Sequence, residues 1–137
     1  MELQTSAQYT QSYGDNVRAL TDEERRVILQ LAAKFASDEE RNKLVTDLDR
    51  CLVSETVPDG SILSFDITDY QRPPGKGRWQ YRQKDGFVID GVVKDADGSD
   101  MDVMLLADAN HRVWEFEIVR HHPGSVIKPD WSTFKVR

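Results

Sequence analysis

Apolar and polar residues alternate between residues 85 and 120, in three short runs separated by two clusters of turn-forming residues. The runs are rich in β-branched and aromatic residues, which favours strands over helices. One face of the runs would carry Phe87, Ile89, Gly91 and Val93, then Met101, Val103, Leu105 and Ala107, then Trp114, Phe116 and Ile118. We therefore expect an antiparallel meander, with Glu115 and Glu117 on the face that meets water.

Two helices are expected before the meander. Thr21 to Glu24 and Ser37 to Glu40 each have the spacing of a capping box, in which a hydroxyl and a carboxylate bond reciprocally to backbone amides. Apolar residues follow at helical spacing, and they are Val27, Ile28, Leu31, Ala32 and Phe35, then Leu44, Leu48, Cys51 and Leu52. This spacing predicts two short helices that are neighbours in space, with Cys51 as a small core residue.

Further strands are expected around these elements. Leu63, Phe65 and Ile67 alternate with polar residues, as do Trp79 and Tyr81, and the tail after Pro129 can form an edge strand or a draped coil. The sequence thus predicts an α+β fold, with two N-terminal helices packed on one face of a four- to five-stranded antiparallel meander. We expect a flexible N-terminal arm at residues 1–19 and a single domain at residues 20–137.

Composition limits the class of protein. The chain has 137 residues, a net charge of −6 and one cysteine, which cannot form an internal disulfide. No apolar run approaches the roughly 20 residues that a membrane span needs, and the first residues lack the pattern of a signal peptide. We expect a cytoplasmic protein without membrane association and without a cofactor.

Acidic residues gather in one hairpin. Seven aspartates and one lysine lie between Asp85 and Asp108, and four of these aspartates, Asp95, Asp97, Asp100 and Asp102, surround one turn. Asp95, Asp97 and Ser99 match the first ligand positions of a calcium loop, but the later glycine and glutamate are absent. We therefore expect no calcium site, and an acidic hairpin tip that favours a basic partner.

Catalytic and zinc-binding patterns are weak. The histidines are His111, His121 and His122, and the adjacent pair would point to opposite faces of a strand. A zinc site would need help from a carboxylate or thiol, and the only thiol is assigned to the core, so no metal site is expected. No serine lies in a nucleophile elbow, and Cys51 is assigned to the core. We expect no enzymatic activity, although a carboxylate pair near Trp79 or Trp114 stays an open alternative.

A basic segment precedes the meander. Arg72, Lys76, Arg78, Arg82 and Lys84 are interleaved with Trp79 and Tyr81, without an acidic residue among them. Basic and aromatic residues in this order are typical of single-strand nucleic-acid binding. The strand alternation would instead direct both aromatic rings to the core, and the chain as a whole is acidic. A nucleic-acid-binding module is the second alternative.

Two segments resemble a known group of proteins. Leu20 to Glu24, and Asp102 to Arg120 with its Val-Trp-Glu-Phe-Glu strand, are similar to small bacterial proteins of unknown function. Some of those resemble immunity proteins of contact-dependent growth inhibition, and the likeness spans about residues 20–122. It implies a protein without catalytic residues that binds a cognate toxin domain, a basic nuclease, and occludes its active site. The expected contact residues are Asp95, Asp97, Asp100 and Asp102, with Asp69 and Tyr70.

Overall fold

The computed structural model describes residues 17–75 and 77–137, and they form two helices and one sheet. The elements are β1 (Val17–Arg18), α2 (Asp22–Ala32), α3 (Asp38–Leu48), β2 (Cys51–Glu55), β3 (Ile62–Ile67), β4 (Trp79–Gln80), β5 (Asp90–Lys94), β6 (Asp100–Ala107), β7 (Val113–Arg120) and β8 (Asp130–Val136).

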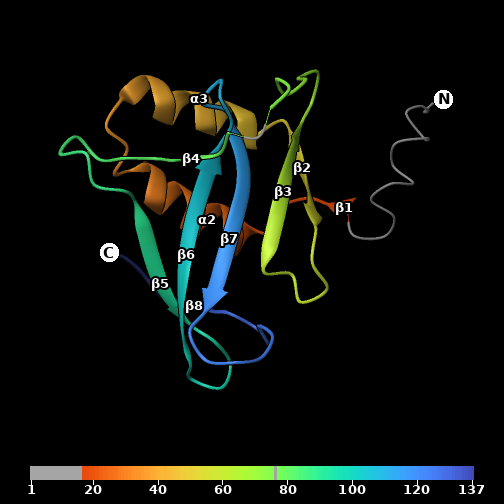
Figure 1. The fold of residues 1–137 in the computed structure, drawn as a ribbon, viewed down its shortest axis with the longest axis vertical. Helices are drawn as coiled ribbons and strands as arrows, with labels where there is room; N and C mark the ends of the chain where they lie inside the picture. Colours follow the sequence, from red (N-terminus) through yellow and green to blue (C-terminus); the bar gives the residue numbers. More distant parts are fainter. Residues whose placement is uncertain (1–16, 76) are drawn as a thin grey trace.

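All strand pairs are antiparallel, and the sheet order is β1-β2-β3-β7-β6-β5-β8, with β4 paired to the end of β6. Both helices lie behind the sheet in Figure 1, so one sheet face is covered. The expected α+β class is confirmed, but four to five strands were too few for an eight-stranded sheet. No helix among the described residues is long and apolar enough to cross a membrane.

The two helices begin where the capping signals predict. In α2 the box is complete, because Thr21 Oγ1 accepts from the Glu24 amide and the Glu24 carboxylate accepts from the Thr21 amide. In α3 only the Ser37 hydroxyl bonds to the Glu40 amide. The Glu40 carboxylate does not close the second half of that box, which corrects the expectation of two equal caps.

The predicted core is formed on the covered face. Phe116 and Ile118 of β7 are buried with Val27, Leu31 and Leu48 of the helices. Trp114 is an exception, because a register shift between Leu106 and Ala107 inserts an extra residue into β7 and turns the indole out of the core. A single inserted residue is sufficient to displace a side chain from the face that alternation assigns to it.

Three further expectations need correction. The second helix ends at Leu48, so Cys51 is half-buried at the start of β2 and Leu52 is exposed. Phe87 and Trp79 are also exposed rather than buried. Val17 and Arg18, assigned to a flexible arm, pair with Val53 and Ser54 of β2. The rest of that predicted arm, residues 1–16, lies outside the described residues.

The sheet curves so that its last strand closes over the core. The rings of Trp131 in β8 and Phe116 in β7 are 5.9 Å apart, although two strands separate β8 from β7 in the sheet. Phe134 and the backbone of Lys135 approach Gly91 of β5 so closely that an added Cβ would lie 2.5 and 2.8 Å from them. The tail is therefore an edge strand, and Gly91 permits its close packing.

Candidate binding surface

Asp95 begins the acidic hairpin but is buried. Its carboxylate accepts from the amides of Ile127 and Lys128 at 2.8–3.2 Å, and from Arg120 Nη1 at 2.6 Å. Burial alone would raise the pKa of Asp95, but these donors and the Ala96 amide outweigh it and lower the pKa. Asp95 anchors the segment before β8 and offers no free charge to a partner.

The other three hairpin carboxylates are paired within the chain. Asp97 forms two hydrogen bonds to the Arg120 guanidinium, and Asp100 lies 2.6 Å from Lys94 Nζ. Asp102 lies 2.6 Å from an Arg137 nitrogen. Arg120 and Arg137, which lie outside the hairpin in sequence, therefore neutralise this cluster together with Lys94.

Asp69 and Tyr70 lie at the opposite end of the sheet from the acidic hairpin. They follow the end of β3, which is parallel to β6, whereas the hairpin precedes β6. Eight residues of β6, roughly 26 Å at 3.3 Å per residue, separate the two places. The six predicted contact residues therefore do not form one surface.

Tyr70 belongs to a network that fixes the loop after β3. Its hydroxyl donates to Asp108 at 2.6 Å, and Arg72 donates to the same carboxylate at 2.8 Å. The Arg112 guanidinium lies 4.1 Å from the centre of the Tyr70 ring and forms two 2.7 Å hydrogen bonds to Asp47. This network is structural, and it connects α3, the loop and the turn between β6 and β7.

The basic segment is also divided by the fold. Arg72 is held by Asp108 and by the carbonyl groups of Phe65 and Val113, and Arg82 donates to the Gly86 carbonyl. Tyr81 is buried and stacks on Phe35 with ring centres 4.1 Å apart. Lys76 lies outside the described residues. The described part of the segment shows no continuous basic face with stacked aromatic rings.

No group of three histidine, cysteine, aspartate or glutamate side chains is placed to hold a metal ion in residues 17–75 and 77–137. Burial is the main cause that raises the pKa of the Cys51 thiol, to about 11. A thiol with a raised pKa is a poor nucleophile and a poor metal ligand at neutral pH.

The sheet face turned away from the helices carries a different set of side chains. We define the open face as Ile62, Ser64, Asp66, Met104, Leu106, Glu115, Glu117 and Val119. Register confirms that they are neighbours, because Glu115 lies between Ser64 and Leu106, and Glu117 lies between Ile62 and Met104. In Figure 1 no helix covers β3, β7 and β6 on the side facing the viewer.

Carboxylates on the open face are less fully paired than those of the hairpin. Among the described residues, neither Asp66 nor Glu117 forms a salt bridge, and Glu115 Oε1 lies 3.5 Å from Arg78 Nη1. That geometry is not a hydrogen bond, and Oε1 is buried without a hydrogen-bond partner. The open face therefore combines apolar side chains with two carboxylates, Asp66 and Glu117, that form no salt bridge within the described residues.

Glu115 is the most perturbed acid of this face. Burial is the largest cause that raises its pKa, and the neighbouring Glu117 carboxyl adds to the increase, against the Arg78 guanidinium. The resulting pKa is about 7, so Glu115 takes up a proton near neutral pH. The expectation of a water-exposed Glu115 was wrong.

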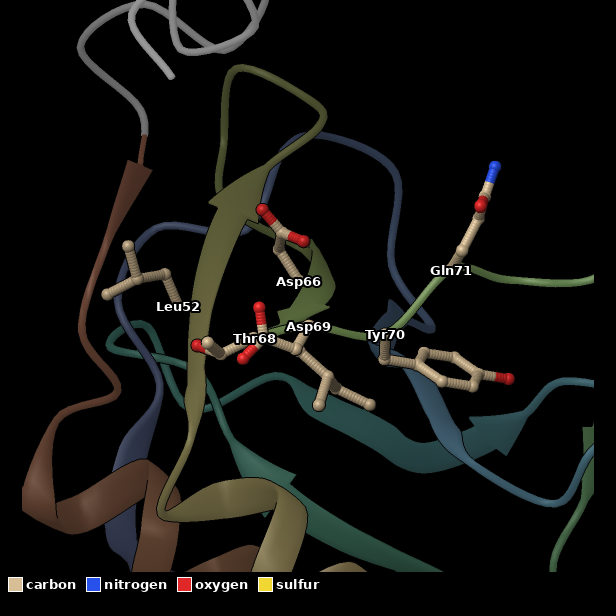
Figure 2. A pocket seen from close by; sticks show the side chains of 7 residues that line it. Leu52, Asp66, Thr68, Asp69, Tyr70 and Gln71 are labelled. Atoms are coloured by element: carbon tan, nitrogen blue, oxygen red, sulfur yellow. The ribbon is translucent and has the colours of Figure 1, made fainter. Parts of the chain in front are cut away.

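A hollow of about 510 Å³ extends the open face at the end of β3. Leu52, Asp66 and Asp69 line it, and Figure 2 shows the Tyr70 ring pointing away from these side chains. Asp69 has a left-handed backbone with φ of 60°, and its carboxylate lies 3.6 Å from Arg50. Of the six predicted contact residues, Asp69 and Tyr70 line the hollow beside the open face. Asp102 lies on the same sheet face opposite Val119, and it is paired with Arg137.

Comparison with known proteins supports a family assignment. A family model described as a domain of unknown function (DUF6984) matches residues 17–129, which is most of the chain. The chain belongs to the DUF6984 family. No curated protein and no solved structure gave a match. The DUF6984 segment contains every strand of the open face, and it ends just before β8.

Sequence reasoning missed the open face for a physical reason. Alternation identified Glu115 and Glu117 as outward residues, but it could not show that Ser64 and Leu106 flank Glu115 across the sheet. In the sheet β3 pairs with β7, although the two strands are about 50 residues apart in the chain. Local sequence pattern therefore could not show that β3 lies beside β7. The signal that was available is the Glu-Phe-Glu alternation, which places two acids on one face.

Proposed function

We propose that this protein is an immunity-type inhibitor, which binds a cognate toxin domain and occludes its active site. The observation that carries the proposal is the open face, where Asp66 and Glu117 lie among apolar side chains and form no salt bridge within residues 17–75 and 77–137. A surface of this kind suits a basic protein partner, because apolar contacts supply affinity and carboxylates supply a faster encounter.

The partner would be a nuclease domain whose phosphate-binding cleft is basic. An acidic sheet face can approach such a cleft in place of the nucleic acid, and the proposal needs no catalytic group in the inhibitor. The contact surface is the open face and the hollow beside Leu52, rather than the acidic hairpin. The hairpin carboxylates are engaged by Arg120, Arg137 and Lys94.

A small enzyme with a carboxylate site is the second candidate. Glu115 has a pKa near neutrality, and Arg78 lies both 3.5 Å from its carboxylate and 5.3 Å from the Trp114 ring centre. A carboxyl group that titrates near pH 7 beside a guanidinium is suited to general acid–base chemistry. The nucleic-acid alternative has less support, because Arg72 is bound to Asp108 within the fold.

The test first asks whether the gene encoded beside this protein specifies a basic nuclease domain, and then measures protection and association kinetics with that domain. Replacing Asp66 and Glu117 by lysine should slow association at least tenfold and weaken its dependence on salt. The matched control is the double variant Glu23→Lys and Glu39→Lys, which makes the same double charge change at exposed positions of α2 and α3. Protection by the double variant that equals the parent would reject the open face as the contact surface.

The absence of binding by the parent itself would reject the proposed function. The enzyme candidate is separated from it by Glu115→Gln. An inhibitor that acts by occlusion should still protect with this variant, whereas an acid–base enzyme should lose its activity.

A further inference from the structure

A second hollow lies outside the open face, where β4 meets the start of α3 and the turn between β6 and β7. Its volume is about 210 Å³, and its walls include Ala36, Ala107 and the ring of Tyr81. The Tyr81 ring is rigid because it stacks on Phe35. The small alanines leave space beside a fixed aromatic wall.

Trp79 forms an exposed aromatic side of this hollow. Its side chain belongs to β4 and pairs in register with Ala107, yet the residue is 56% exposed. Part of the indole lies against Gly77, where an added Cβ would be 3.3 Å from Trp79 Nε1. The rest of its apolar surface meets solvent, although burial of that surface would be favourable. The exposed part of the indole is therefore available to a flat or cationic group.

Glu40 supplies the acidic group of the hollow. The Glu40 carboxylate does not cap α3. In α2 the Glu24 carboxylate accepts a hydrogen bond from the N-cap amide, whereas the capping box of α3 lacks this second hydrogen bond. Among the described residues, His111 Nδ1 lies 3.5 Å from Glu40 Oε2. His111 is held there by a left-handed backbone with φ of 60°, which costs free energy in a residue other than glycine.

Arg82, the basic residue at the rim of the hollow, is bound elsewhere and leaves the Glu40 carboxylate accessible. Arg82 lines the hollow, but its Nη1 donates to the Gly86 carbonyl at 2.7 Å and so is bound to the hairpin loop. Tyr81 keeps a neutral hydroxyl, because burial raises its pKa further above neutrality. Glu40 is thus the one carboxylate that lines the hollow in the described part of the chain.

We propose that this hollow binds the guanidinium group of an arginine side chain. A guanidinium can stack on the Trp79 indole while its edge donates two hydrogen bonds to the Glu40 carboxylate, and the two contacts demand a planar cation. Arginine fits better than lysine, because the ammonium group is compact, strongly hydrated and cannot stack. The alkyl part of the side chain would lie against Ala36 and Ala107.

The source of the arginine is the basic partner, and in that respect the inference rests on the proposed function. The hollow lies beside β4, at the same end of β6 as the open-face residue Leu106. Ala107, which lines the hollow, is buried on the helix side of the sheet. A basic domain on the open face would therefore extend around this end of the sheet to insert one arginine. The guanidinium site itself is measurable without any partner.

The test titrates the full-length protein with Nα-acetyl-arginine N-methylamide and follows its amide and indole NMR signals. We expect saturable shifts of Trp79 and His111 in the millimolar range. The neutral isostere, Nα-acetyl-citrulline N-methylamide, should bind at least tenfold more weakly, and the lysine analogue should also be weaker.

Glu40→Gln should reduce arginine binding at least tenfold, and Glu39→Gln, one residue away on the exposed side of α3, should leave it unchanged. Thermal melting of both variants checks that the fold is kept. Equal binding of the citrulline analogue, unchanged binding by a folded Glu40→Gln variant, or no saturable shift with the parent would overturn the inference. Arginine binding without toxin protection would reject the proposed function and leave this site standing.

Discussion

At the scale of single residues, Asp95 is a structural anchor inside an acidic turn. We expect Asp95→Asn to lower the free energy of unfolding by about 3 kcal/mol or more, since it leaves Arg120 with one buried partner fewer. Asp100→Asn is the control, because that carboxylate is exposed and forms its ion pair with Lys94. Urea unfolding measures both, and equal stability of the two variants would contradict the buried role of Asp95.

The same anchor predicts the response to acid. The folded-state pKa of Asp95 lies below its unfolded value, so its stabilisation is complete above the unfolded pKa of about 3.9 and disappears as pH falls through the folded value. The parent should therefore lose stability below about pH 4 more steeply than Asp95→Asn does. Unfolding curves between pH 2 and pH 6, roughly the range of carboxyl titration, give this slope.

Glu115 should respond in the opposite direction. Its folded-state pKa, about 7, lies above the unfolded value, so the proton stabilises the fold at low pH and this contribution is lost as pH rises through 7. Glu115→Gln should therefore be more stable than the parent at pH 8, by on the order of 2 kcal/mol, and nearly equal to it at pH 4. A stability difference that does not change with pH would contradict the raised pKa.

The sequence alone identified the acidic residues of the hairpin, but it did not show what role each of them has in the fold. Asp95 and Asp97 were recognised as a cluster, but their partner Arg120 is 23–25 residues away and comes from the next strand. The ion pair between Arg137 and Asp102 spans 35 residues. Because charge pairing depends on which strands are neighbours, local pattern identified the acids and could not show that they are neutralised.

At the scale of elements, Gly91 decides how closely β8 can approach β5. Gly91→Ala should cost about 2 kcal/mol or more, because the methyl group would meet the Phe134 ring and a backbone carbonyl. Gly98→Ala is the comparison, since space is open there and only the positive φ of 87° adds strain. A smaller loss at Gly91 than at Gly98 would contradict the close packing of β8.

Element prediction succeeded where the signal is local. Capping residues identified the start of both helices, and alternation identified the buried faces of β3, β5 and β6. Prediction failed at β2, because Cys51 and Leu52 continue the helical spacing of α3 although the helix ends at Leu48. It also failed at Trp114, because the inserted residue in β7 depends on its pairing with β6.

At the scale of the whole molecule, β8 completes a core that the matched family segment leaves open. A chain that ends at Pro129 would lose the Trp131 contact with Phe116 and the Phe134 contact with Gly91. We expect its melting temperature to fall by more than about 10 °C, or the truncated chain not to fold. The control replaces exposed Lys135 with alanine. A truncated chain that melts with the parent would show that β8 is dispensable.

The order of strands in the sheet also has consequences for the rate of folding. Strands β5, β6 and β7 follow one another along the chain, so their pairing closes only short loops and can form early. The pairing of β3 with β7 closes a much longer loop, which contains β4, β5 and β6. The pairing of β8 with β5 likewise closes a loop that contains β6 and β7. We therefore expect a transition state built on the central meander, with high φ-values in β6 and low values in β8.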